Sequence, residues 1–158
     1  MRTLLGTSSL PVVVDADGLF GLEPAPRDAP TILTPHAGEL ARLLEVESAW
    51  VAAHRLEAAA RAAERFGAVV LLKGADTIVC APDGRTVVCD TGPSSLATAG
   101  TGDVLTGIVG AFLAKGLDAV DAAAAAAVAH GLAARAVPHQ VGLVASDVVA
   151  ALPAILDP

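Results

Sequence analysis

Continuous apolar runs in the first half of the chain predict strands that are buried on both faces. Residues 11–14 are a proline followed by three valines, and residues 68–72 contain only alanine, valine and leucine. Such runs are typical of parallel sheets, because helices cover both faces of a parallel sheet. A shorter strand is expected at residues 31–33, after a proline-rich loop at 24–30.

Four further segments have the composition or the spacing of helices. Residues 48–66 are rich in alanine, arginine and glutamate, with Ser48 as a candidate N-cap and Gly67 just beyond the last turn. Apolar residues recur at helical spacing from 104 to 113, until a Lys-Gly pair closes the pattern. Alanine-rich faces suited to close packing predict two more helices, at residues 118–137 and 146–152.

The order of these elements predicts the fold class. Strands that alternate with helices indicate a three-layer α/β fold with a mostly parallel sheet. Residues 77–90 alternate around a Pro-Asp-Gly turn, which adds an antiparallel hairpin at the edge of the sheet. Polar motifs begin at or next to the carboxyl ends of three strands, at residues 15–18, 34–39 and 73–77. Because functional groups in such sheets lie at these ends, we expect the three motifs to face one crevice.

Composition limits the size and the partners of the protein. The 158 residues suffice for one domain, spanning 1–158, and are too few for two ordinary domains. A hydrophobic content of 54% with only 17% charged residues excludes disorder and leaves a surface sparse in charge, part of which another element could cover. The net charge of −7 and the absence of any Lys/Arg run exclude a nucleic-acid footprint.

The cysteines and the apolar segments argue against a metal centre and against a membrane. Cys80 and Cys89 lie in the predicted hairpin, with neither a CxxC spacing nor nearby histidines, so we expect two reduced core thiols and no protein-built metal site. The chain starts without a signal-peptide core, and its alanine-rich stretch is too short to cross a bilayer. A cytoplasmic protein is expected.

A glycine-rich loop precedes the helix predicted at 104–113. Residues 97–103 are small except for a terminal aspartate, and include Gly100 and Gly102. Glycines let a backbone approach phosphate oxygens, and a helix N-terminus offers free N–H groups and the positive end of a dipole. Asp103 would repel phosphates unless it meets a proton or a metal, so it suits a general base for a substrate hydroxyl. It could equally be the N-cap of the helix, and the local sequence leaves both readings open.

The chain as a whole resembles a known family from Val12 onward. The strings VVVDADGL, ILTPHAGELARLL, LLKGADTIV, LATAGTGDVLTGIVGAFLAKG and AVAHGLAARAV occur in the order found in the ADP-dependent NAD(P)H-hydrate dehydratases. These enzymes are a branch of the ribokinase-like superfamily, so the resemblance implies a ribokinase-like α/β/α fold. The GTGD loop is shared with vitamin-precursor kinases of that superfamily. His36 favours the dehydratases, because the kinases tend to carry asparagine at that position.

The resemblance implies a reaction and a set of site residues. Hydrated NADH or NADPH of the S configuration would lose its hydroxyl at the expense of ADP, or of ATP, with Mg²⁺, and ADP would leave as AMP and phosphate. Asp103 would contact the hydrated ring and take the hydroxyl proton, and His36 would bind the hydrated dinucleotide. Gly102 would lie against the nucleotide phosphate. The adenine nucleotide would also be lined by a loop of five residues: Lys73, Gly74, Ala75, Asp76 and Thr77.

Two departures from the family pattern leave rival readings open. Residues 92–95 are Gly-Pro-Ser-Ser where the family usually has Asn-Pro, and about another hundred residues normally precede the matching segment. We therefore expect a domain incomplete at its N-terminus, weakly active alone, and completed by homo-oligomerisation, as a tetramer by resemblance, or by a complementing chain. The rivals are an ATP-dependent kinase of a hydroxymethylpyrimidine- or hydroxyethylthiazole-type alcohol and a non-catalytic ADP/AMP-binding fragment.

Asp15 and Asp17 could be cap and turn residues or could hold metal-bound water.

Overall fold

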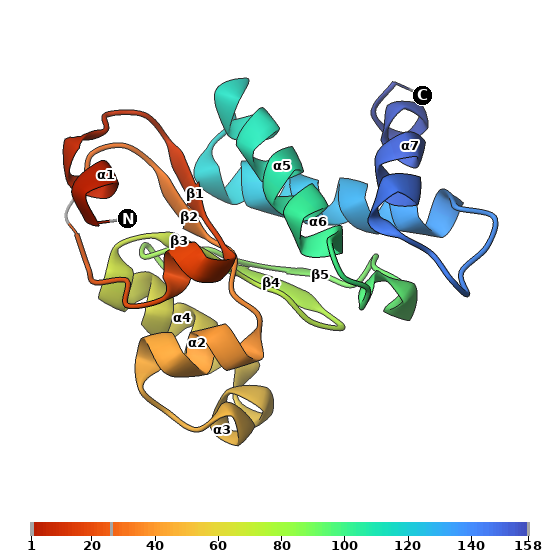
Figure 1. The fold of residues 1–158 in the computed structure, drawn as a ribbon. Helices are drawn as coiled ribbons and strands as arrows, with labels where there is room; N and C mark the ends of the chain where they lie inside the picture. The colour runs from red at the N-terminus through yellow and green to blue at the C-terminus, as the bar shows by residue number, and fades with distance from the viewer. Residues whose placement is uncertain (1, 26, 158) are drawn as a thin grey trace.

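The sheet lies at the centre of the molecule, and its strands follow one another in the order of the chain (Figure 1). The computed structural model describes residues 2–25 and 27–157, so positions 1, 26 and 158 of the expected domain, including one in the loop 24–30, lie outside the described residues. The strands are β1 (Val12–Val14), β2 (Thr31–Leu33), β3 (Val69–Leu72), β4 (Thr77–Cys80) and β5 (Thr86–Cys89).

The sheet has a parallel half and an antiparallel half. β1 pairs with β2, and β2 with β3, in parallel, whereas β3 pairs with β4, and β4 with β5, in antiparallel fashion. The buried parallel strands and the antiparallel edge hairpin are confirmed. Within the described residues the two kinds of pairing are equally frequent, so the sheet is best described as mixed.

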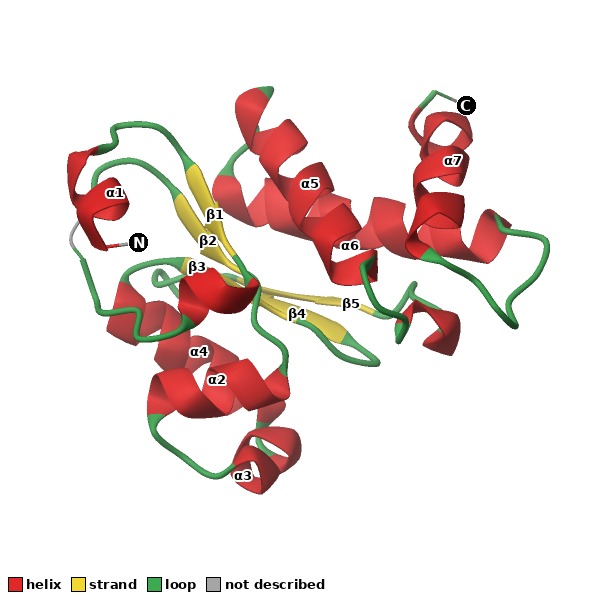
Figure 2. Ribbon diagram, in the orientation of Figure 1, coloured by secondary structure: helices red, strands yellow, loops and turns green. Residues whose placement is uncertain are grey.

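Helices cover both faces of the sheet, as Figure 2 shows. One side carries α2 (Ala37–Leu44), α3 (Ser48–Ala53) and α4 (Arg55–Phe66), and the other carries α5 (Thr101–Ala114) and α6 (Ala119–Ala136). The last helix, α7 (Ala145–Leu156), packs on α6 and α5. Successive strand residues point to opposite faces. Val70 and Leu72 therefore pack with α2 and α4, whereas Val69 and Leu71 pack with α5 and α6. This double burial explains why the strands are apolar throughout, and it confirms the three-layer arrangement.

The segment 48–66 forms two helices where one was predicted. At His54 the backbone leaves the helical region, with φ −130° and ψ 45°, so α3 ends and α4 begins there. Glu47 is the N-cap of α3, and the prediction of Ser48 as the cap is wrong, because Ser48 is already helical. Gly67 ends α4 in the left-handed conformation, as expected.

Three short elements complete the chain. A short helix, α1 (Arg2–Thr7), was not predicted, and two 3₁₀ turns, η1 (Ala16–Leu19) and η2 (Ser94–Leu96), follow β1 and β5. Both cysteines are buried and free, as expected for core thiols. None of the helices in the described part of the chain is long and apolar enough to span a bilayer.

Candidate active site

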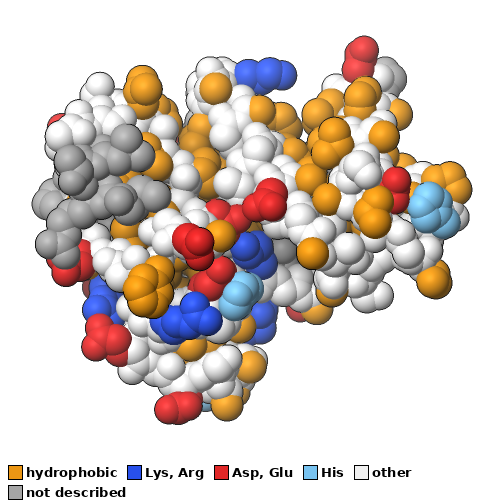
Figure 3. Space-filling model, in the orientation of Figure 1, with side chains coloured by type: hydrophobic (Ala, Val, Ile, Leu, Met, Phe, Trp, Pro, Cys, Tyr) orange, Lys and Arg blue, Asp and Glu red, His pale blue; other side chains and the backbone are white. Residues whose placement is uncertain are grey.

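Side chains from the ends of the three parallel strands meet at one edge of the sheet. Lys73, which follows β3, places its Nζ 2.8 Å from the carboxylate of Asp15, which follows β1. The same Nζ lies 4.0 Å from Glu39 of α2, the helix that follows β2. Acidic, basic and histidine side chains gather in the middle of this face, between α2 and α5 (Figure 3). The prediction that the three polar motifs converge at one edge of the sheet is confirmed.

Asp15 is the anchor of this cluster. Its side chain is 10% exposed and accepts hydrogen bonds from Lys73, from the Thr106 hydroxyl of α5 at 2.6 Å and from the Ala16 amide at 2.8 Å. Burial alone would raise the pKa of Asp15, but the hydrogen bonds from Lys73 and Thr106 and the charge of Lys73 outweigh burial, so its pKa lies below the ordinary value. Asp15 therefore caps η1 and holds Lys73 in place.

The N-terminus of α5 lies beside the Lys73 ammonium. Gly100 is the N-cap, with φ +86°, and no side chain caps the first amides of the helix. A Cβ built on Gly102 would stand 3.6 Å from Lys73 Nζ, so the ammonium lies next to the first turn. Free amides and a neighbouring cation together suit an anion, phosphate above all.

Asp103 occupies the first turn of α5 and is exposed. The alternative that Asp103 caps the helix is wrong, because Gly100 holds the cap position. No hydrogen bond or ion pair engages the Asp103 carboxylate within residues 2–25 and 27–157, so it is available to a substrate hydroxyl. The general-base role stays a prediction.

His36 has a local role in the backbone. It is the N-cap of α2, and its Nδ1 accepts hydrogen bonds from the amides of Gly38 and Glu39 at 3.0 and 3.3 Å. The Glu39 carboxylate in turn accepts from the His36 amide at 2.7 Å, which completes a capping box. These bonds fix the ring with Nε2 outward, 3.5 Å from the other Glu39 oxygen, and leave the side chain 54% exposed. A substrate contact through Nε2 is compatible with this cap.

The loop after β3 is supported by a residue that the sequence did not single out. Arg55, at the start of α4, donates a hydrogen bond from Nη2 to the Asp76 carbonyl at 2.6 Å. Its guanidinium also lies against Gly74, where a Cβ would stand 2.6 Å from Nη1 and 2.7 Å from Cζ. The absence of a side chain at Gly74 therefore admits Arg55 beneath the loop. No local signal marks Arg55, which is one of several arginines in its helix.

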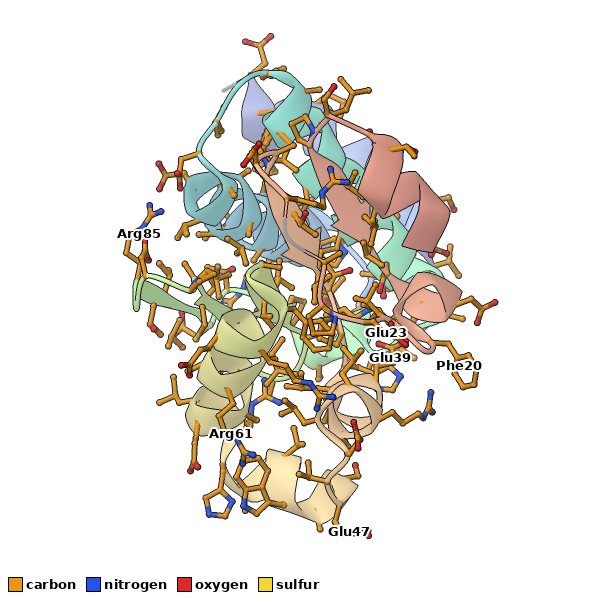
Figure 4. All side chains as sticks on the ribbon, turned by 90° about the vertical axis from the view of Figure 1, so that its left-hand side faces the viewer. Phe20, Glu23, Glu39, Glu47, Arg61 and Arg85 are labelled. Atoms are coloured by element: carbon orange, nitrogen blue, oxygen red, sulfur yellow. The ribbon has the colours of Figure 1, made fainter. Side chains whose placement is uncertain are left out.

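A cavity of about 490 Å³ is lined by His36, by the loop after β3 and by the first turn of α5. Among the residues expected to bind ligands, it is lined by His36, Lys73, Gly74, Ala75, Thr77 and Gly102, whereas Asp76 and Asp103 are not in its lining. Its other walls include Thr91 and His130, neither of which was predicted as a site residue. A second cavity, of about 740 Å³, lies between η1 and α2, where Figure 4 shows Phe20 projecting outward beside Glu23 and Glu39.

The sequence matches one family over most of its length. Residues 3–154 match the model of the NAD(P)H-hydrate dehydratase family. A bifunctional NAD(P)H-hydrate repair enzyme of Moorella thermoacetica is 42% identical over 99% of this chain and 31% of its own length. An ADP-dependent (S)-NAD(P)H-hydrate dehydratase of Neisseria meningitidis is 44% identical over 85% of this chain and 48% of its own length. The chain thus spans about a third to a half of these curated relatives.

Solved structures are similar to the whole fold. The ADP/ATP-dependent NAD(P)H-hydrate dehydratase of Bacillus subtilis, co-crystallised with ATP and Mg²⁺, superimposes with a TM-score of 0.92 at 32% identity, over 98% of this chain and 58% of its own. A ribokinase-like superfamily protein of Enterococcus faecalis superimposes with a TM-score of 0.72 at 23% identity, over 91% and 51%. The fold is therefore ribokinase-like.

Proposed function

Because this chain belongs to the NAD(P)H-hydrate dehydratase family, we propose that it acts in the ADP-dependent dehydration of (S)-hydrated NADH or NADPH to the normal cofactor, with AMP and phosphate as by-products. The observation that carries this proposal is the placement of the Lys73 ammonium against the open first turn of α5, at one end of a nucleotide-sized cavity. Amides and ammonium stabilise the charge that develops on a transferred phosphoryl group.

The nucleotide would lie along the loop after β3 and the start of α5. Lys73 would contribute a point charge whose position is fixed by Asp15. Gly74, Ala75 and Thr77 line the cavity, and Gly102 lies beside the expected phosphates. Asp76 would contribute through the position of its backbone, which Arg55 holds.

The hydrated dinucleotide would approach Asp103 and His36 from the open side of the crevice. Hydroxide is a poor leaving group and phosphate a good one. The ring hydroxyl would therefore attack the terminal phosphorus of ADP, AMP would leave, and phosphate would then be eliminated from the ring together with a ring proton. Asp103 would accept the hydroxyl proton as the oxygen attacks. The exposed Nε2 of His36 would bind the dinucleotide, while its Nδ1 keeps the capping bonds.

Mg²⁺ fits the crevice only together with a nucleotide. No group of three or more acidic, histidine or cysteine side chains among residues 2–25 and 27–157 could hold a metal ion by itself. Magnesium in phosphoryl-transfer sites is commonly held by one or two carboxylates and the substrate phosphates. Glu39, 13% exposed and 4.0 Å from Lys73, offers such a carboxylate beside the expected phosphates. Mg²⁺ would there neutralise charge on the nucleotide.

An assay on the purified protein tests the proposal. Hydrated NADH and Mg²⁺ are incubated with ADP or with ATP, and the return of NADH absorbance is followed. We expect return with ADP, slow for a monomer and faster once homo-oligomerisation or an added complementing chain completes the domain. Light scattering on the same sample reads the assembly state. If neither nucleotide restores NADH but ADP raises the melting temperature, the protein is a nucleotide-binding module, since selective binding stabilises the native state. Phosphorylation of an added vitamin-precursor alcohol by ATP would support the kinase instead.

Asp103→Ala separates chemistry from binding. We expect turnover to fall by at least about 100-fold, because general-base catalysis contributes that much or more, while ADP binding is largely kept. Asp121→Ala is the matched control, because Asp121 is also an exposed aspartate in the first turn of a helix, α6. Equal loss of turnover and of ADP binding in Asp103→Ala would make Asp103 structural.

A further inference from the structure

Two buried polar atoms in the wall of the 490 Å³ cavity have no hydrogen-bond partner among the described residues. They are the hydroxyl oxygen of Thr91, in the loop after β5, and Nε2 of His130, in α6. His130 is only 6% exposed, and both residues line the cavity. An unpaired buried polar group costs about 1–3 kcal/mol, so two in one wall call for a ligand that pairs with them.

Helix α6 fixes both groups where they are. The loop at Thr91 lies directly on Gly131: a Cβ there would stand 2.5 Å from the Thr91 hydroxyl and 2.8 Å from the Gly92 nitrogen. One turn further along α6, Arg135 Nε donates to the Thr91 carbonyl at 2.5 Å. Helix α6 therefore carries the imidazole itself and, through Gly131 and Arg135, contacts the loop that carries the hydroxyl.

The hydrogen-bonding character of His130 follows from its burial. Burial lowers the pKa of His130 below its ordinary value, and a hydrogen bond from the ring to the Thr101 backbone opposes this effect only in part. The ring is therefore neutral near pH 7. A neutral imidazole carries one N–H, and when that N–H serves the Thr101 backbone, the other nitrogen is an acceptor. Thr91 can donate or accept.

The apolar part of the cavity lining suits the nucleoside part of a nucleotide. Lys73 and Gly102 mark the place for phosphates, whereas the lining also contains small or apolar residues, namely Leu96, Ala97, Leu105 and Ala127. A flat base or a ribose buries apolar surface in such a wall, and its few polar groups then need fixed partners.

We propose that Thr91 and His130 bind the nucleoside part of an adenine nucleotide, with His130 Nε2 accepting a hydrogen bond from an N–H or O–H group of the ligand. The group is either the exocyclic amine of adenine or the ribose 2′-hydroxyl. This inference rests on the nucleotide site of the proposed function, and it adds the residues that select the nucleoside.

Calorimetric titration with three diphosphates tests the proposal and identifies the group. The probes are ADP, inosine 5′-diphosphate, which has an oxo group in place of the amine, and 2′-deoxy-ADP, which lacks one ribose hydroxyl. We expect one of the two analogues to bind about 10-fold more weakly than ADP, as the loss of one buried hydrogen bond implies. In His130→Phe, which keeps a ring of similar shape, that difference should shrink to within about 2-fold.

Controls separate selection from folding. His54→Phe changes an exposed histidine between α3 and α4 and should keep the difference. Should His130→Phe fail to fold, Thr91→Val, which replaces the hydroxyl by a methyl group, must reduce the difference instead. Equal affinity of the wild-type protein for all three diphosphates would mean that the two atoms hold only water, and would overturn the inference while the nucleotide site stands. A difference that persists in both variants overturns it too, and failure of all three to bind overturns the nucleotide site as well.

Discussion

Two regions of the 490 Å³ cavity, around Lys73 and around His130, differ in how their polar groups are paired. At the Lys73 end, the ammonium and the Asp15 carboxylate are paired, and Thr106 adds a further hydrogen bond. At the His130 end, two polar atoms have no partner within the described residues. Groups that are paired before a ligand arrives keep their geometry, whereas unpaired buried groups gain most from the ligand that matches them. Under the proposed function, the first region would place charge and the second would select the nucleoside.

The largest effect is expected at the paired end. Lys73→Met removes the counter-charge of a nearly buried carboxylate, so we expect a loss of about 3 kcal/mol of unfolding free energy, measured by urea denaturation at pH 7. ADP binding should weaken as well. Lys115→Met, which changes an exposed lysine at the end of α5, is the control and should alter stability by less than about 0.5 kcal/mol. An equally small loss in Lys73→Met would show that the pair contributes little.

Gly131→Ala should have the next largest effect, at the unpaired end. The added Cβ would meet the backbone at Gly92, which cannot move as a flexible side chain can. Overpacking costs about 1–3 kcal/mol, and the higher helix propensity of alanine returns up to about 1 kcal/mol, so we expect a net loss near 1–2 kcal/mol. Gly107→Ala in α5, where nothing lies within 4 Å of the new Cβ, should instead be stabilising. Thermal unfolding of both variants would settle whether α6 holds the Thr91 loop.

The dependence of stability on pH should carry a signature of His130. Its pKa is lower in the folded protein than the ordinary value of 6.5, so below that value the unfolded chain takes up a proton that the folded protein resists. The free energy of unfolding is therefore unaffected by this group above pH 6.5. As the pH falls from 6.5 toward the folded-state pKa, it decreases by up to about 1.4 kcal/mol per pH unit. Denaturation of wild type and His130→Phe between pH 5 and pH 8 measures it. An unchanged slope in the variant would assign the effect to other groups.

Gly74→Ala should have the smallest effect. The added Cβ would meet the guanidinium of Arg55, which is the far end of a flexible side chain and can withdraw. We expect a stability loss below about 0.5 kcal/mol, with weaker ADP binding because the loop loses its support from Arg55. Comparing the stability loss with that of Gly131→Ala tests this explanation. Equal losses of stability in the two variants would mean that the Arg55 side chain is held as firmly as backbone.

Much of the fold could be predicted, because it depends on local patterns. The valine run at β1 and the glycine after α4 are read directly from the chain. The break at His54 was missed because alanine, arginine and glutamate continue helical composition across it. Convergence of the polar motifs could also be predicted, since it follows from where parallel strands end.

The partners within the site could not be predicted in the same way. Asp15 and Lys73 are 58 positions apart, and only the packed sheet brings them within 2.8 Å. His130 lies in an alanine-rich helix, where no local pattern marks it as a site residue, and its place in the cavity wall depends on how α6 meets the loop at Thr91. Arg55 likewise reaches Asp76 across 21 positions. Contacts of this kind depend on tertiary distances that no local pattern contains.

The antiparallel hairpin of β4 and β5 sets the distance between two loops of the cavity wall. Thr77 and Cys89 face each other as cross-strand partners at its open end, and both line the cavity, one leading from the loop after β3 and the other toward the loop at Thr91. The gap between the two loops is thus set by one ladder pair. Because this pair joins the two strands, a change in the twist of the hairpin would move both loops together.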